Sequence, residues 1–287
     1  MTDNKHIVRI WGGLGNQLFQ YALYMSFKDK GYDTYADISA FTKYSKGRNY
    51  QLPFLGIDVD EANVWDIIKL YCHPRDPVAK AIIKRIGKKT YYRQRENFYD
   101  PKVFDTDKGY FDGYWQSYKY FENVAEEIRE KISFGNISDE IVDRIKKDNN
   151  SVSIHVRLGD YLLRPDLYGG ICTEEYYKEA IKHIKDRIQK RTDEKTHFYV
   201  FSNDIDQAKI ILGDDDDITY TNGYPEDEGY KDLYLMSLCQ HHIIANSSFS
   251  WWGAFLGNYD DSITVAPKRW VNGIRGEDII PSDWIRI

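Results

Sequence analysis

The sequence has few cysteines and no long apolar run. Its 287 residues contain Cys72, Cys172 and Cys239, an odd and widely spaced set. Such a set argues against a disulfide framework or a zinc site and indicates reduced thiols. No stretch approaches the apolar length that a membrane helix needs. The polar residues 1–6 do not open a secretory signal peptide. We therefore expect a cytoplasmic protein.

The chain also lacks an excess of positive charge. Its 39 lysines and arginines are outnumbered by 45 aspartates and glutamates, which gives a net charge of -6. A surface of this sign does not attract polyanions, so we expect no nucleic-acid partner. Hydrophobic residues make up 42% and charged residues 29% of the chain, which is ordinary for a globular protein. The length suits one large α/β domain or two smaller ones.

The N-terminal half opens with a strand–loop–helix–strand pattern. An apolar strand is expected at 7–11, a glycine loop at 12–15, a helix at 17–30 and a second strand at 32–37. Further along, the pattern predicts a strand at 109–115 and helices at 120–132 and 138–150. This half therefore begins as a βαβ unit.

The C-terminal half alternates more regularly between strands and helices. Strands are predicted at 152–156, 197–202, 218–221, 242–245 and 263–266, and helices at 173–190, 205–212, 228–240 and 249–256. Strands separated by helices predict a parallel, doubly wound sheet, in which ligands bind beyond the carboxyl ends of the strands. We expect two domains, at residues 1–140 and 141–287.

The first motif is the glycine loop, Gly-Gly-Leu-Gly-Asn-Gln at 12–17. Gly13, Gly15 and Asn16 lie between a strand and a helix, where a phosphate can approach the backbone. The loop resembles a dinucleotide fingerprint but has Leu18 in place of the third glycine. Asp37 stands where a ribose-binding acid would be. A nicotinamide-dependent oxidoreductase therefore stays an alternative, as does a tight turn that binds nothing.

The second motif is His-Val-Arg-Leu-Gly-Asp at the end of the strand 152–156. His155 and Arg157 alternate onto the same side of the strand. An arginine there can fork onto a diphosphate and keeps its charge, and Asp160 is a carboxylate that can accept a proton. The structural alternative is a buried histidine beside an arginine–aspartate pair.

Two more motifs follow later strands. Asp204 ends Phe-Ser-Asn-Asp, where it can bind a nucleobase edge or ribose, or simply cap the next helix. In Asn-Ser-Ser-Phe-Ser-Trp-Trp-Gly, which begins at Asn246, Ser247 and Ser248 can hold phosphate oxygens at a helix start. The aromatic residues of this motif are expected in the core. The strand ends converge on one crevice, which favours a phosphate-bearing nucleotide as ligand.

Together these motifs resemble the bacterial α-1,2-fucosyltransferases of glycosyltransferase family 11. Gly-Tyr-Trp-Gln-Ser-Tyr-Lys-Tyr-Phe at 113–121 belongs to the same set, and the motifs span most of the chain in the family's order. The resemblance implies a GT-B-like α/β fold, with two Rossmann-like doubly wound domains whose parallel sheets face a central cleft. It implies transfer of L-fucose from GDP-fucose to the 2-hydroxyl of a β-linked galactose on a glycan, with inversion and without a metal. The expected acceptor is an O-antigen, capsule or lipid-linked oligosaccharide, and a fucosyltransferase of other linkage or acceptor stays an alternative.

The resemblance also implies residue roles. Arg157 would hold the donor diphosphate, His155 would orient the donor, and Asp160 is the candidate base. The positions that would contact the nucleotide or sugar are Gly13, Gly15, Asn16, Asp204, Asn246, Ser247 and Ser248. The N-terminal domain is then the acceptor side and the C-terminal domain the GDP-fucose side.

Three further alternatives stay open. The acidic run Asp214–Asp217 could hold a metal, but its place between a glycine and a strand favours a solvated turn. A non-catalytic sugar- or nucleotide-binding module would share the same motifs. A basic helix at 78–89 carries an apolar stripe, so we also predict peripheral contact with the inner, anionic face of the membrane. The sequence does not predict the oligomeric state.

Overall fold

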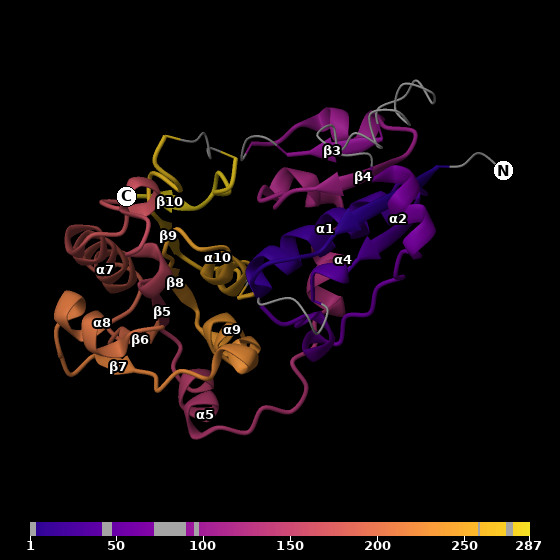
Figure 1. Cartoon of the computed structure of the whole chain (residues 1–287). Helices are drawn as coiled ribbons and strands as arrows, with labels where there is room; N and C mark the ends of the chain where they lie inside the picture. Colours follow the sequence, from indigo (N-terminus) through magenta and orange to yellow (C-terminus); the bar gives the residue numbers. More distant parts are fainter. Residues whose placement is uncertain (1–3, 42–47, 72–89, 95–97, 258, 274–277) are drawn as a thin grey trace. The chain divides into compact units, whose positions relative to one another are not determined.

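The computed structural model describes residues 4–41, 48–71, 90–94, 98–257, 259–273 and 278–287, with the side chain of Asp160 left out. The predicted basic helix at 78–89 lies outside these residues. Contacts divide the chain into an N-terminal unit, Met1–Ser133, and a C-terminal unit, Phe134–Ile287 (Figure 1). The division precedes residue 140, the boundary predicted from the sequence. The Phe134 ring already packs against Tyr234 of the C-terminal unit, with centroids 5.0 Å apart.

The N-terminal unit is a four-stranded sheet in the order β2-β1-β4-β3, and all its pairings are parallel. Its strands are β1 (Lys5–Arg9), β2 (Asp33–Asp37), β3 (Tyr91–Arg93) and β4 (Gly109–Asp112). Its α-helices are α1 (Leu14–Asp29), α2 (Val64–Leu70) and α4 (Ala125–Lys131). Short 3₁₀ turns lie at Ser39–Phe41, Leu52–Leu55, Pro101–Asp105, Tyr118–Tyr120 and Glu122–Val124.

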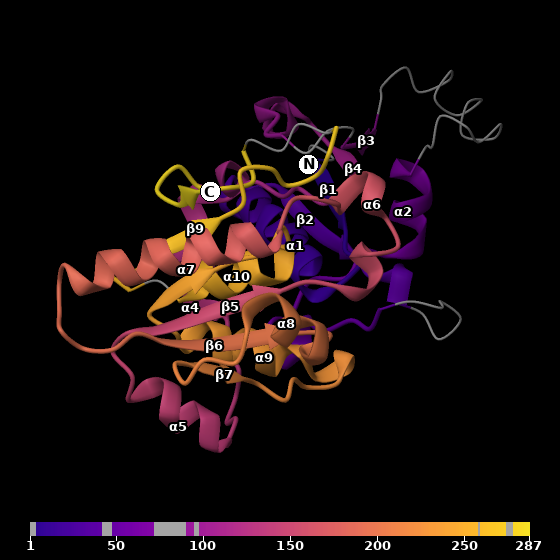
Figure 2. The ribbon, with the colours of Figure 1, turned by 90° about the vertical axis from the view of Figure 1, so that its left-hand side faces the viewer.

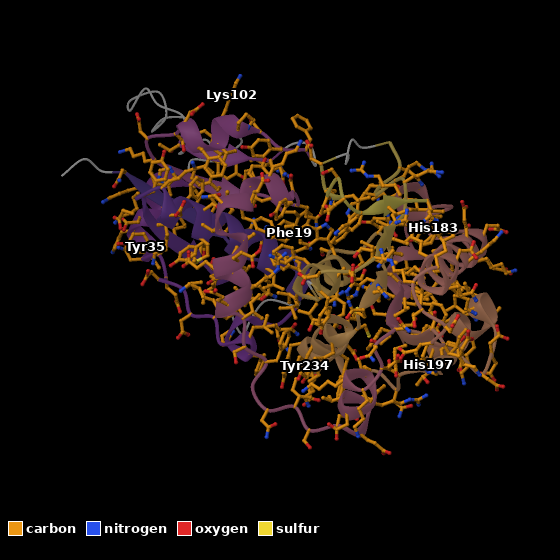
Figure 3. The ribbon with its side chains drawn as sticks, turned by 180° about the vertical axis from the view of Figure 1, so that it is seen from behind. Phe19, Tyr35, Lys102, His183, His197 and Tyr234 are labelled. Atoms are coloured by element: carbon orange, nitrogen blue, oxygen red, sulfur yellow. The ribbon has the colours of Figure 1, made fainter. Side chains whose placement is uncertain are left out.

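Helix α1 supplies most of the core on one face of this sheet. It is buried along nearly its whole length, and Phe19 (Figure 3) and Phe27 are fully buried. Gly31, at φ 80°, ends the helix in a left-handed conformation, and the Tyr32 N–H donates back to the Phe27 carbonyl. Helix α2 covers the other face through Leu70. The predicted βαβ opening is therefore confirmed.

The C-terminal unit is a six-stranded sheet in the order β10-β9-β8-β5-β6-β7, again with parallel pairings. Its strands are β5 (Ser151–Val156), β6 (His197–Ser202), β7 (Ile218–Tyr220), β8 (His241–Ile243), β9 (Thr264–Ala266) and β10 (Ile285–Arg286). Its α-helices are α5 (Glu140–Lys146), α6 (Pro165–Tyr168), α7 (Glu174–Gln189), α8 (Ile205–Leu212), α9 (Gly229–Leu238) and α10 (Ser248–Leu256), with 3₁₀ turns at Gly159–Tyr161 and Glu226–Glu228.

Helices cover both faces of this sheet. Helices α7 and α8 lie on one face, and α9 and α10 on the other (Figure 1, Figure 2). All six residues of β5 are buried, as a central parallel strand requires. The Thr173 side chain caps α7 by accepting from the Tyr176 N–H at 3.3 Å, as predicted. Two Rossmann-like parallel-sheet units are thus present, which confirms the predicted GT-B-like fold class.

Every helix within the described residues is too short or too polar to cross a membrane.

Candidate functional site

The strand order of the C-terminal unit creates a switch point between β5 and β8. From β5 the chain moves outward to β6 and β7, and then returns to β8, β9 and β10 on the other side. In open α/β sheets, ligands bind at the carboxyl edge of such a point. Helices α8, α9 and α10 each follow a strand, so their N-terminal ends also lie at this edge. The predicted convergence of strand ends is therefore present.

The turn after β5 is fixed to both neighbouring strand ends. The Leu158 N–H donates to Asn203 Oδ1 at 2.9 Å, beyond β6. The Tyr161 hydroxyl donates to the Asn246 carbonyl at 2.9 Å, beyond β8. Gly159 has φ 60°, and a Cβ there would lie 2.3 Å from Asn203 Nδ2, so glycine is required. The backbone that carries Arg157 is consequently held at the centre of the edge.

His155 lies in β5, and Arg157 directly follows the last residue of that strand, Val156. Arg157 is half-buried, and its guanidinium lies 5.5 Å from the centre of the Tyr161 ring. His155 is buried, 5.8 Å from the Phe249 ring, and its Nδ1 has no hydrogen-bond partner among the described residues. Burial, together with the charge of Arg157, lowers the pKa of His155 to about 3. His155 is therefore a neutral imidazole, available as a hydrogen-bonding group and not as a cation.

The start of α10 has features that suit an anion. Ser247 is its N-cap and accepts from the Phe249 N–H at 3.3 Å, and the first turn carries no acidic residue. The backbone N–H groups and helix dipole at Ser248 favour a negatively charged ligand. Trp251 and Trp252 are fully buried, which confirms their predicted place in the core. Phe249 differs because it is half-buried against His155.

The Asn246 side chain is hydrogen-bonded within the protein. Its Nδ2 donates to the Trp270 carbonyl at 2.9 Å, and its Oδ1 accepts from the Cys172 thiol at 3.4 Å. Both polar groups of the side chain are therefore occupied within the protein. These bonds hold the turn before α10, and contact of Asn246 with a nucleotide stays a prediction.

Asp204 caps α8, which was the structural alternative for this residue. Its Oδ1 accepts from the Gln207 N–H at 3.1 Å. The residue is half-buried at the carboxyl end of β6. Cap and ligand contact are compatible, because one carboxylate offers several lone pairs.

Asp232 is a functional candidate that the sequence reasoning missed. It lies in the first turn of α9, where Oδ2 accepts from the Tyr224 N–H at 3.2 Å, while Oδ1 is buried without a partner in the described structure. Burial raises the pKa of Asp232 to about 6. A buried acceptor left unsatisfied is costly, so one at a ligand-binding edge marks a place for a donor group. In the sequence, the residue looks like any acid at a helix start.

Asp160 follows Gly159 in the 3₁₀ turn after β5. Its side chain lies outside the described structure, so its role as base stays a prediction.

The N-terminal unit presents its own glycine loop. Gly12 has φ 86°, and Gly13 is the N-cap of α1 without a side-chain cap or an acidic first turn. Gly15 is buried, and Asn16 Oδ1 accepts from Gln116 Nε2 at 2.7 Å. That bond links the glycine loop to the segment after β4. A helix start without an acidic residue suits an anion, and the predicted ligand contact of this loop stays a prediction.

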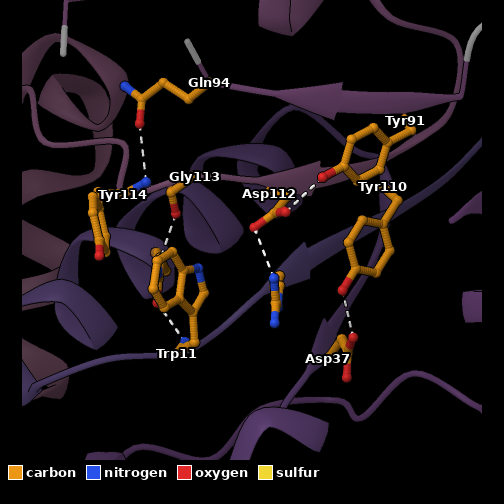
Figure 4. A network of polar contacts seen from close by, with 10 residues as sticks. Trp11, Asp37, Tyr91, Gln94, Tyr110, Asp112, Gly113 and Tyr114 are labelled. Carbon is orange, nitrogen blue, oxygen red and sulfur yellow. Dashed lines mark hydrogen bonds and ion pairs between the residues drawn. The ribbon is translucent and has the colours of Figure 1, made fainter. Parts of the chain in front are cut away.

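The polar groups around this loop mostly bind one another (Figure 4). Asp112 accepts from Arg9 at 3.2 Å and from the Tyr91 hydroxyl at 2.6 Å. Asp37 is buried and accepts from the Tyr110 hydroxyl at 2.5 Å and from the Ser39 N–H at 2.9 Å. Asp37 is 3% exposed and each of its carboxylate oxygens already accepts a hydrogen bond, which disfavours contact with a ribose. This weakens the nicotinamide alternative, and Leu18, in place of the third glycine, is fully buried.

The acidic run Asp214–Asp217 is a turn before β7. Asp214, Asp215 and Asp216 are exposed, and Asp217 pairs with Lys185 at 2.6 Å. Within the described residues, no three histidine, cysteine or acidic side chains lie close enough to hold a metal. The position favours the solvated turn over a metal site.

Two doubly wound units with parallel sheets place the chain in the GT-B-like class of α/β proteins. Within that class, the chain belongs to the family described as Glycosyl transferase family 11, whose sequence profile matches residues 2–287. It is thus a glycosyltransferase.

Three related proteins align with nearly the whole of this chain. An Escherichia coli "Alpha-1,2-colitosyltransferase" is 34% identical over 98% of this chain and 98% of its own. The E. coli "O-antigen biosynthesis glycosyltransferase WbnK" is 27% identical over 96% and 98%. The human "Galactoside alpha-(1,2)-fucosyltransferase 1" is 21% identical over 96% of this chain and 73% of its own.

Solved structures give more distant likenesses. Arabidopsis thaliana FUT1, solved as a variant with GDP, aligns with a TM-score of 0.48 at 11% identity over 92% of this chain and 70% of its own. The NodZ α-1,6-fucosyltransferase soaked with GDP-fucose aligns with a TM-score of 0.45 at 14% identity over 88% and 92%.

Proposed function

We propose that this family 11 glycosyltransferase moves L-fucose from GDP-fucose to the 2-hydroxyl of a β-linked galactose on a glycan, with inversion. The observation that carries the proposal is the pairing of Arg157 with the start of α10 at the switch point of the C-terminal unit. A fixed guanidinium and a helix N-terminus suit a diphosphate. The names of the relatives support α-1,2 transfer of a deoxyhexose.

GDP-colitose is a second candidate donor. The relative at 34% identity is named a colitosyltransferase. Colitose is fucose without its 3-hydroxyl, so the two donors differ at one hydrogen-bonding group on the sugar. A site with a partner for that hydroxyl favours fucose, because a buried polar group left unpaired penalises the deoxy analogue.

Asp232 would recognise the guanine base of the donor. The guanine edge carries N1–H and N2–H donors, and Asp232 Oδ1 is a buried acceptor without a partner among the described residues. A carboxylate in this position favours guanine over bases that present acceptors there.

The proposed reaction is a single displacement. The acceptor hydroxyl attacks the anomeric carbon, the bond to the diphosphate breaks, and GDP departs with the electron pair. Arg157 and the N–H groups at Ser248 would stabilise the charge that builds on the leaving diphosphate. We propose that this replaces the metal used by other transferases, and that Asp160 takes the proton of the acceptor hydroxyl.

The test is a panel of GDP-fucose, GDP-colitose and GDP-mannose with galactose-terminated oligosaccharides, with and without EDTA. The expected product from GDP-fucose is an α-1,2 linkage, determined by NMR, and its yield should not change with EDTA. Faster transfer from GDP-colitose would revise the donor. If the protein binds GDP-fucose but transfers fucose to none of the acceptors, it is a non-catalytic binding module.

We further propose that the basic segment at 78–89 contacts anionic lipid, where a lipid-linked acceptor would lie. Liposome flotation checks this: binding should require anionic lipid. Flotation that does not depend on lipid charge would remove the idea.

A further inference from the structure

Tyr161 contacts both of the elements proposed to hold the donor diphosphate. Its hydroxyl donates to the Asn246 carbonyl at 2.9 Å, immediately before the Ser247 cap of α10. The Arg157 guanidinium lies over its ring, 5.5 Å from the centroid. One side chain therefore connects the arginine at the end of β5 to the helix start that follows β8.

The ring is itself fixed from behind. Tyr168, at the end of α6, stacks on Tyr161 with centroids 4.0 Å apart and an interplanar angle of 13°. Tyr161 therefore contacts a stacked tyrosine, a guanidinium 5.5 Å from its ring centre and, through its hydroxyl, the Asn246 backbone.

We propose that Tyr161 is a positioning residue, which holds the Arg157 guanidinium in the direction of the donor diphosphate and in register with the start of α10. The inference rests on the proposed function, in which Arg157 binds the diphosphate. Tyr161 itself touches no part of the donor in this account. It acts through Arg157 and through the backbone at Asn246.

The physical reason is preorganisation. A free arginine side chain has many rotamers and loses that freedom when it binds a phosphate. A stacked aromatic ring fixes the plane of the guanidinium before the ligand arrives, and the attraction between cation and ring adds to the effect. If Tyr161 acts through Arg157, its substitution should weaken the binding only of ligands that carry phosphate. A structural role would instead weaken the binding of all ligands alike.

The test measures dissociation constants of GDP and guanosine for Tyr161→Phe and Tyr161→Leu. The phenylalanine keeps the ring and loses only the hydrogen bond to Asn246, so GDP should bind about threefold more weakly. The leucine also loses the ring, so GDP should bind about tenfold more weakly. Guanosine should bind both variants within about twofold of wild type, since it lacks the group that Arg157 contacts.

A double-mutant cycle with Arg157→Ala isolates the coupling. In that background, Tyr161→Leu should lower GDP affinity by only about threefold, the effect of the lost Asn246 hydrogen bond, because the guanidinium that the ring positions is gone. The matched control is Tyr35→Leu on β2 (Figure 3), where Lys5 lies over the ring at 5.1 Å in the other unit; it should leave GDP affinity unchanged.

Three results would overturn the inference. Equal weakening of GDP and guanosine by Tyr161→Leu would mean a structural role, and an undiminished effect in the Arg157→Ala background would mean that Tyr161 does not act through Arg157. Unchanged GDP affinity in Tyr161→Leu would refute it directly. A wild-type protein that binds no GDP would overturn the proposed function and this inference together.

Discussion

The two units share a parallel sheet with a switch point, but they treat their buried carboxylates differently. At the carboxyl edge of the N-terminal sheet, Asp37 and Asp112 each accept two hydrogen bonds from neighbouring protein groups. At the corresponding edge of the C-terminal sheet, Asp232 Oδ1 and His155 Nδ1 are buried without partners in the described structure. Buried polar groups that the protein leaves unsatisfied are rare, and they cluster where a ligand completes them.

The carboxyl edges of the two parallel sheets therefore differ in what they contribute to the protein. At the N-terminal edge the carboxylates are bonded within the protein around a glycine loop, although Trp11 Nε1, just after β1, is buried there without a partner in the described structure. The C-terminal edge has gaps in its hydrogen bonding beside a half-buried arginine. We therefore expect substitutions at the first edge to lower stability and substitutions at the second to lower nucleotide binding.

The largest predicted effects distinguish Arg157, after β5 of the C-terminal sheet, from Arg9, at the end of β1 in the N-terminal sheet. Arg157→Ala should lower kcat/KM about 10²- to 10³-fold, because the developing charge on the diphosphate loses its guanidinium, with the fold intact. Arg9→Ala should instead lower the free energy of unfolding by about 1–3 kcal/mol, because it removes a partner of buried Asp112. Steady-state kinetics and denaturant unfolding check the pair. Near-normal turnover of Arg157→Ala would contradict its role.

Asp232→Asn should weaken GDP binding about 30-fold, because an amide offers one acceptor in place of two and adds donors that face guanine donors. The same change should stabilise the ligand-free protein at pH 7. The pKa of Asp232 is about 6 in the folded state, above its ordinary value of 3.8, so the ionised form costs stability at neutral pH. The gain should be of order 1 kcal/mol. Calorimetry measures both, and a destabilised variant with normal GDP affinity would contradict the assignment.

Guanosine affinity should depend on pH through the same carboxyl group. The pKa of Asp232 is raised to about 6 by burial, so the carboxylate is ionised above that pH and protonated below it. Affinity should be constant from pH 8 to 7 and fall about tenfold by pH 5. Guanosine is the probe because it has no phosphate that titrates in this range. The Asp232→Asn variant is the control and should show no such fall.

The smallest effect should appear at Asp204. Asp204→Ser keeps a good N-cap on α8 but removes the carboxylate, so GDP affinity should fall about threefold while stability changes little. Asp206→Ser, an exposed acid in the same helix turn, is the matched control. Wild-type GDP affinity in Asp204→Ser would leave Asp204 as a cap alone.

Much of the fold could be predicted because its signals are local. Strand β6 and helix α8 have the predicted bounds, since a short continuous apolar run and a capping aspartate mark them within a few residues of sequence. Strands β3 and β10 were not predicted, because three and two residues are too short to show a period of two.

The site could be predicted only in part, because its details depend on which strand ends lie side by side. Arg157 and the start of α10 follow from motifs at strand ends. The occupation of the Asn246 amide depends on Trp270, and the role of Tyr161 depends on β5 lying beside β8. The open oxygen of Asp232 is a property of packing, and the chain around it gives no sign of it.

A crystal structure with GDP tests the central claim most directly. The account predicts the diphosphate between the Arg157 guanidinium and the first N–H groups of α10, with guanine against Asp232. GDP bound at the Gly12–Asn16 loop alone, with the end of β5 empty, would contradict it.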